Sequence, residues 1–163
     1  MRLSYYLLIT LIAVSCSDDV GLSFDENNGG LFLPEGFKAL VVHEGVGKSR
    51  HIAVNHNGDI YVKLAKDFGR DGNVALRDAD GDGKAEIIQR FGDYPNDGRF
   101  ATEMKINDGY LYYSSERVVY RQRLNSKKLV PNSPVEVILT DPYPIRWHNA
   151  KSIAFDKENH MYV

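Results

Sequence analysis

The chain has 163 residues, of which 43% are hydrophobic and 26% are charged, and its formal net charge is −2. That length is enough for one ordinary globular domain with a sizeable core. The nearly balanced charge argues against a nucleic-acid-binding protein, which needs a basic face. One basic run, Arg117–Lys128, alternates with apolar residues, and we interpret it as the solvated face of a strand rather than a binding patch.

The first residues are predicted to be an export signal. Arg2 precedes an apolar stretch, Tyr5–Val14, that is too short to span a bilayer as a mature helix. Small residues directly before Cys16 resemble a bacterial lipobox, which implies cleavage before Cys16 and a lipid on its sulfur. The alternative is an ordinary signal peptide with an incidental cysteine. Cys16 is the only cysteine, so the chain cannot form an intramolecular disulfide.

These features predict three regions: a lipoprotein signal peptide over residues 1–15, a lipidated Cys16 with a flexible tether over 16–32, and the folded part over 33–163. The acidic stretch Ser17–Asp19 is similar to the surface-export signals of some Gram-negative lipoproteins. We therefore expect an exported lipoprotein that is periplasmic or anchored to the outer membrane, where the acidic stretch would favour exposure on the surface. Its contact with the membrane would run through the lipid alone.

Within the folded part, Phe37–His43 is apolar and β-branched and is predicted to be a strand. A short pattern then recurs about every fifty residues: an apolar strand, a polar turn, and a second strand centred on a tyrosine. Its copies are His51–Val62, Met104–Tyr113 and Ser152–Val163. A repeat of that period, built of strands and turns, is typical of a β-propeller blade.

The turns of the three copies share the same chemistry. Asn57-Gly58 and Asp108-Gly109 supply the positive φ that tight hairpins need. In the third copy Asn159 stands in the glycine position, and asparagine tolerates positive φ better than most residues. The chemistry of the turn is therefore predicted to survive the change of residue in the third copy.

A second pair of strands is predicted after each of the first two hairpins: Gly72–Arg77 with Ala85–Phe91, and Arg117–Leu124 with Val135–Leu139. Four strands per unit make one propeller blade. The sequence thus predicts an all-β chain that holds about two and a half blades of a propeller truncated at its C-terminus. A β-sandwich lacks the repeat, and a solenoid usually has a shorter one. Expressed alone, such a fragment is expected to expose unpaired edges and to aggregate.

One turn carries a dense group of acidic residues. Asp78, Asp80, Asp82 and Glu86 place several oxygens around one point, as a calcium ion requires. An EF-hand is excluded because its twelfth position holds Gln89. The alternative to a calcium loop is an Asp/Gly turn between two strands.

Two histidines precede inner strands of the repeat and are candidates for the central channel. His148 lies just before the third copy, and His51 opens the first. A histidine at such a place can accept a proton near neutral pH. His43, His56 and His160 are interpreted as surface or edge residues without acidic neighbours. The chain has no phosphate-binding glycine loop, nucleophile elbow or zinc spacing.

Several segments together carry a family resemblance. They are, in order, Leu33–Phe37, Arg50–Val54 with Asn57–Val62, Asp78–Glu86 and His148–Asp156. The chain resembles the glucose/sorbosone dehydrogenase family, six-bladed propellers related to soluble quinoprotein sugar dehydrogenases. The resemblance covers roughly Leu33 to Val163.

The resemblance implies oxidation of a sugar or polyol by pyrroloquinoline quinone (PQQ), with an electron acceptor that the sequence leaves unknown. By position, His148 looks like the family's catalytic base. The family's cofactor contacts, and the calcium that activates the quinone, lie in later blades, so no cofactor-binding residue is assigned here. Two rival functions stay open: a non-catalytic propeller that binds glycans or a protein, and a propeller hydrolase, for which the inner strands offer few acids.

Overall fold

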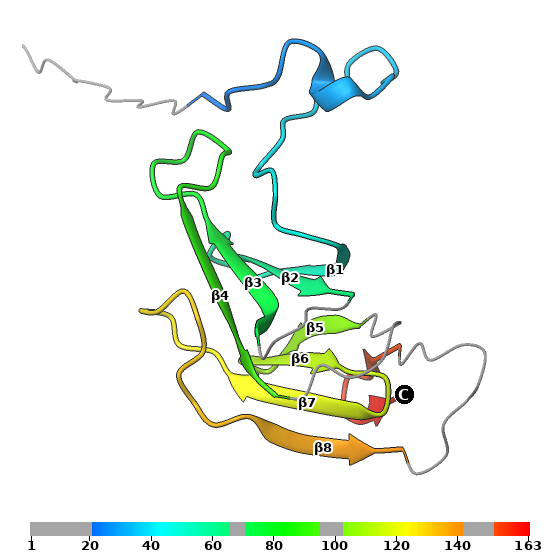
Figure 1. The fold of residues 1–163 in the computed structure, drawn as a ribbon. Coiled ribbons are helices and arrows are strands. Elements are labelled where there is room, and N and C mark those ends of the chain that lie inside the picture. Colours follow the sequence, from blue (N-terminus) through cyan, green and yellow to red (C-terminus); the bar gives the residue numbers. More distant parts are fainter. Residues whose placement is uncertain (1–20, 66–70, 95–102, 142–151) are drawn as a thin grey trace, which may run out of the picture.

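A computed structural model of the chain describes residues 21–65, 71–94, 103–141 and 152–163. Apart from one short 3-10 turn, η1 (Asn28–Gly30), all regular structure in these ranges is β (Figure 1). No helix within them is both long enough and apolar enough to cross a membrane. The predicted all-β class is therefore confirmed.

Eight of the strands form two sheets of the same design. The first sheet contains β1 (Ser49–Val54), β2 (Ile60–Leu64), β3 (Asp71–Arg77) and β4 (Ile87–Asp93). The second contains β5 (Met104–Asn107), β6 (Tyr110–Ser114), β7 (Val118–Arg123) and β8 (Glu136–Thr140). Each sheet is an antiparallel meander in which sequence order equals spatial order. That is the arrangement of a propeller blade.

A third hairpin, β9 (Ala154–Phe155) with β10 (Met161–Tyr162), lies beside the second sheet (Figure 1). Its Asn159 carboxamide oxygen accepts a hydrogen bond of 3.3 Å from Asn107 Nδ2, which joins the turns of the second and third copies. The first strand of each unit lies innermost, since β1 contacts β5 and the start of β9 contacts β5. The described chain is thus a partial β-propeller, as the sequence predicts.

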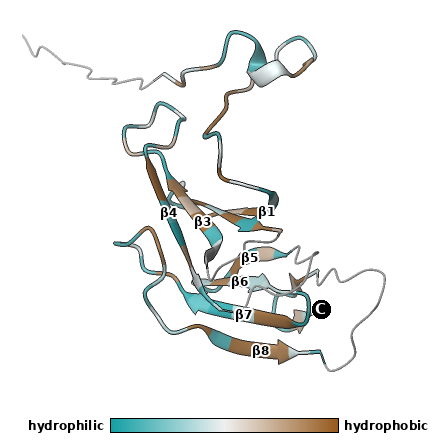
Figure 2. Ribbon diagram, in the orientation of Figure 1, coloured by the Kyte–Doolittle hydropathy of each residue, from teal (hydrophilic) through white to brown (hydrophobic). Residues whose placement is uncertain are grey.

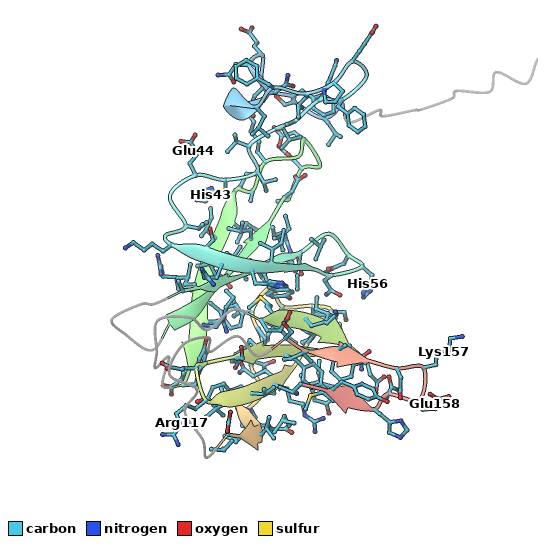
Figure 3. All side chains as sticks on the ribbon, turned by 90° about the vertical axis from the view of Figure 1, so that its right-hand side faces the viewer. His43, Glu44, His56, Arg117, Lys157 and Glu158 are labelled. Atoms are coloured by element: carbon cyan, nitrogen blue, oxygen red, sulfur yellow. The ribbon has the colours of Figure 1, made fainter. Side chains whose placement is uncertain are left out.

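The predicted turn chemistry is confirmed. In the first hairpin Gly58 has φ 89°, and Gly58 N donates to Asn55 O at 3.0 Å. In the third hairpin Asn159 has φ 65°, and Asn159 N donates to Asp156 O at 3.2 Å. Asparagine therefore takes the place of glycine in an otherwise identical turn. The turns carrying His56 and Lys157–Glu158 point to the same side of the molecule (Figure 3).

The main core lies between the two sheets and is rich in tyrosine. Tyr94 stacks against Tyr113 and Tyr120 with ring centroids 4.8 Å and 4.7 Å apart. Tyr61 is 1% exposed, and its hydroxyl donates to Leu129 O at 3.0 Å, across to the second unit. Burial of these hydroxyls costs little free energy because each has a hydrogen-bond partner, and the rings stabilise the core by removing large apolar areas from water. The other members of this core include Ala75, Phe91, Met104 and Leu111.

Smaller apolar clusters cover the remaining faces of the two sheets. One contains Val62, Leu64, Val74, Leu76 and Ala85, with Val42, Val46 and Ile60 packed against it. The other joins Tyr112 and Val119 of the second sheet to Ile153 at the third hairpin. Apolar side chains also stand exposed at the inner edge and at β8, which is largely hydrophobic in Figure 2. They are Ile52, Val54, Val137 and Leu139.

The prediction of a strand over Phe37–His43 is wrong. The segment is irregular, because its backbone bonds to scattered partners instead of one neighbouring strand. Ala39 N donates to the Asn28 side chain, Val41 N donates to an Asp25 carboxylate oxygen, and Val42 O accepts from Ala85 N. Residues 25–30, predicted as tether, contain the η1 turn, and two of these partners, Asp25 and Asn28, lie in this segment. Residues 39–42 are half-buried and Phe37 is 69% exposed, so apolar β-branched composition by itself produced neither a buried segment nor a ladder.

Candidate functional site

The N-terminal ends of the three inner strands, β1, β5 and β9, meet at one end of the structure. Glu103, directly before β5, is 8% exposed and reaches both neighbouring units. Its Oε2 accepts a hydrogen bond of 3.2 Å from the backbone N–H of Ile153, just before β9. Its Oε1 lies 3.5 Å from Nδ1 of His51 on β1, and accepts from Met104 N at 3.1 Å. One carboxylate thus joins all three copies of the repeat.

Contacts of the Nδ1 atom hold the His51 ring in place. Nδ1 lies 3.1 Å from the backbone oxygen of Met104, in addition to the Glu103 carboxylate. The His51 side chain is 43% exposed, whereas that of Glu103 is 10% exposed. His51 also lines an open depression of about 300 Å³ together with Ser49, Arg50 and Ile52. This pairing of a buried carboxylate, an oriented imidazole and a solvent-facing ring edge is the arrangement that enzymes use to hold a base.

A row of polar residues continues from His51 across the buried face of the first sheet. His51 is in register with Lys63, and Lys63 with Asn73. Lys63 is fully buried, and burial lowers the pKa of its amine to about 7. The amine donates to Leu64 O at 3.1 Å and lies 5.4 Å from the ring centroid of Tyr94.

Asn73 fixes the far end of this row. Its Oδ1 accepts from the Tyr94 hydroxyl at 3.0 Å, while its Nδ2 is buried without a hydrogen-bond partner in the described part of the chain. Gly92, with φ 105°, lets the Tyr94 ring come close, since a Cβ there would lie 2.6 Å from the ring. Burial raises the pKa of Tyr94 well above the ordinary phenol value, so its hydroxyl stays a donor. At its buried end the row therefore consists of the uncharged side chains of Asn73 and Tyr94, next to the Lys63 amine, whose basicity is weakened by burial.

The predicted base, His148, lies in 142–151, outside the described residues, and its role stays a prediction. Ser152, the next described residue, directly precedes Ile153, whose amide binds Glu103. His51, the second channel candidate, lies on β1 beside Glu103, and its place in a channel stays a prediction. Sequence reasoning missed Glu103, Lys63 and Asn73. The only sequence signals for them were a charged residue inside the apolar β2 run and an acid at the start of a repeat copy.

The four acidic residues of the predicted calcium loop do come together. One carboxylate oxygen from each of Asp78, Asp80, Asp82 and Glu86 lies within 4.8 Å of the others. The same carboxylates also accept backbone hydrogen bonds; Asp78 accepts them from Gly81 N at 2.6 Å and from Gly83 N at 2.8 Å. Slight desolvation raises the pKa of Asp78, but these N–H groups outweigh it and lower the pKa overall. Both the turn and the calcium interpretation fit, and calcium binding stays a prediction.

His43, His56 and His160 are all exposed, as predicted, but the prediction that His160 has no acidic neighbour is wrong. His160 Nδ1 lies 2.9 Å from Asp156 Oδ2, so it has an acidic neighbour four residues earlier. Glu158 completes this second exposed acidic group. The hairpin turn produces the pairing, because it folds residue 160 back onto residue 156.

The basic run Arg117–Lys128 is confirmed in part as the solvated face of a strand. Its Arg121 and Arg123 lie over the Tyr110 ring, 4.4 Å and 5.3 Å from the ring centroid.

Comparisons with known proteins support the fold. No protein-family model matches the chain, and no curated protein matches it. Among solved structures, the chain is similar to the holo form of the pyranose dehydrogenase PQQ domain from Coprinopsis cinerea. The TM-score is 0.61 at 12% sequence identity, and the match covers 78% of this chain and 29% of that one. The chain shares the propeller fold with that PQQ domain and spans less than a third of its length.

Proposed function

We propose that the chain belongs to a quinoprotein that oxidises a sugar or polyol at the channel end of the propeller. The observation that carries the proposal is the convergence of His51, Glu103 and the Ile153 amide at the entrances of three inner strands. The fold that the chain shares with the PQQ domain of a pyranose dehydrogenase also supports this proposal.

The described residues fit only one edge of a PQQ site. PQQ carries three carboxylates and two adjacent quinone oxygens, which would need several cationic donors from the protein. In the depression beside His51, the cationic side chain among the described residues is that of Arg50. The Glu103 carboxylate would repel an anionic ring placed directly against it. We therefore assign no PQQ-binding residue. When bound, such a quinone supplies the two-electron acceptor for a hydride from the substrate carbon.

The chain's own contribution would be to take the proton of the substrate hydroxyl. His148 is our candidate for that base, because it precedes the third inner strand as His51 opens the first. A positioned general base contributes about 10²–10⁴-fold to rate. At His51, a backbone oxygen and a carboxylate fix the ring in one orientation, which is what a base at the equivalent place in the third copy would require.

The test is reconstitution of the full-length protein with PQQ and calcium, followed by dye reduction with a panel of sugars and polyols. We expect sugar-dependent turnover in the wild type and a loss of about 10²-fold or more in His148→Gln. His56→Gln, in an exposed turn, is the matched control and should keep full turnover. Unchanged turnover in His148→Gln removes His148 from the mechanism. No quinone-dependent turnover with any sugar refutes the function and favours a non-catalytic binding propeller.

We also propose that the protein is an exported lipoprotein held at the membrane by the lipid on Cys16. The support is the short apolar stretch followed by small residues and a single cysteine. Labelling with a radioactive fatty acid should mark the wild type and not Cys16→Ser. A wild type that takes up no label and fractionates without the membrane would contradict the anchor.

A further inference from the structure

The orientation of the His51 ring is fixed by groups that can only accept hydrogen bonds. Nδ1 faces the Met104 backbone oxygen at 3.1 Å and the Glu103 carboxylate at 3.5 Å. A carbonyl and a carboxylate both require a donor, so Nδ1 carries the proton. In the neutral ring, Nε2 then holds a lone pair and acts as an acceptor.

That acceptor belongs to a ring with an open side. The His51 side chain is 43% exposed, and its contacts with Glu103 and Met104 run through Nδ1. The adjoining depression, about 300 Å³, is at the lower end of the range of small-molecule sites. Arg50 and Ser49 line it and contribute N–H and O–H donors. The depression therefore combines one acceptor with several donors.

We propose that His51 binds a hydroxyl group of a sugar or polyol through Nε2, with Glu103 and Met104 holding the ring from behind. Each sugar hydroxyl both donates and accepts, so one hydroxyl can donate to Nε2 while a neighbouring one accepts from Arg50 or Ser49. This assigns a substrate-binding role to the second channel histidine and leaves proton abstraction to another group. It rests on the proposed function for the class of ligand.

A purely structural role for the pair makes different predictions. Glu103 already joins the third unit through Ile153 N and the second through Met104 N, so it holds these two inner strands together without His51. If His51 only completed that contact, any side chain that donates to Met104 O would replace it fully. Asparagine and glutamine separate the two roles: the Asn amide reaches the position of Nδ1, and the Gln amide reaches the position of Nε2.

The experiment measures sugar binding to the full-length protein without added quinone. Isothermal titration with glucose, galactose, xylose and sorbitol gives the affinities, and imidazole ¹⁵N spectra give the protonated nitrogen of His51. We expect the Nδ1–H form and a change in the His51 signals when a sugar binds. We expect His51→Asn to weaken binding about tenfold or more, as for loss of a buried hydrogen bond, and His51→Gln to weaken it less. His56→Asn, in the exposed turn at the other end of β1, should bind as the wild type does.

The outcomes separate this inference from the proposed function. If His51→Asn binds every sugar as tightly as the wild type, or if the proton lies on Nε2, the inference is overturned. Dye reduction by that variant with PQQ can then still support the proposed function. If a sugar binds at His51 but no quinone-dependent turnover is found, the proposed function fails and the binding site stands. If no member of the panel binds, the inference is overturned, and melting curves of the variants establish that this is not unfolding.

Discussion

Replacing Asp59 with asparagine should remove an ion pair that joins the turn of the first hairpin to Arg77 at the end of β3. Asp59 is 2% exposed, and its two oxygens accept from Arg77 Nε at 2.6 Å and Arg77 Nη2 at 2.8 Å. Asn57 Nδ2 donates to the same carboxylate at 2.9 Å. An amide at position 59 keeps the volume but turns one acceptor into a donor that faces a guanidinium N–H. We expect a loss of about 2–3 kcal/mol in the free energy of unfolding at pH 7.

The pH dependence of this loss has a definite sign. Burial raises the pKa of Asp59, but the hydrogen bonds from Arg77 and Asn57 outweigh it, so the pKa lies below its ordinary value. A carboxyl with a depressed folded-state pKa stabilises the protein above the unfolded pKa of about 3.9, and this is lost as pH falls through the folded pKa. The difference between wild type and Asp59→Asn should therefore be full at pH 6–7 and shrink toward pH 3.

Urea unfolding of the full-length protein, followed by tryptophan and tyrosine fluorescence, measures the difference. The matched control is Glu136→Gln, which removes the partner of Arg121 from a pair with Nη2–Oε2 2.9 Å. Those side chains are 31% and 45% exposed, so solvent screens them and the control should lose less than about 1 kcal/mol. A loss in Asp59→Asn no larger than in the control, or one unchanged at pH 3, would refute the reasoning.

Three further predictions concern the repeat and its turns. Tyr61→Phe should cost about 1–2 kcal/mol, since it leaves the buried Leu129 carbonyl unpaired; Tyr162→Phe, at the same place in the third copy but exposed, should be nearly neutral in the same urea assay. Asn159→Ala should lower the melting temperature, because φ 65° costs alanine about 1 kcal/mol and alanine lacks the short polar side chain whose local hydrogen bonds let asparagine adopt it; an Asn159→Gly variant that melts as low as Asn159→Ala would contradict this. Because backbone N–H groups already occupy the carboxylates of the acidic loop, we expect millimolar calcium to leave the melting temperature unchanged. A rise in the wild type that disappears in Asp80→Asn would establish the calcium site instead.

The sequence by itself determined the blades, because their signals are local. Alternating apolar residues mark a strand, and a glycine or asparagine at a fixed place in a turn supplies the positive φ that reverses the chain. Asn159 at φ 65° shows how far this holds, since the turn survives without glycine. The wrong prediction of a strand over Phe37–His43 marks the limit of local signals: the composition is apolar and β-branched, but a ladder needs a partner strand that composition does not supply.

Only the tertiary structure decided which polar residues meet. His51 and Met104 are 53 positions apart, and Glu103 and Ile153 are 50 positions apart. These contacts form because the repeat brings the entrances of neighbouring inner strands together, so residues at equivalent places in different copies become neighbours. The local sequence offers only an acid at the start of a repeat copy as a sign of the role of Glu103, since its partners are a backbone amide and an imidazole in other units. The repeat thus predicted where a site would lie, and packing of one unit against the next selected the residues that build it.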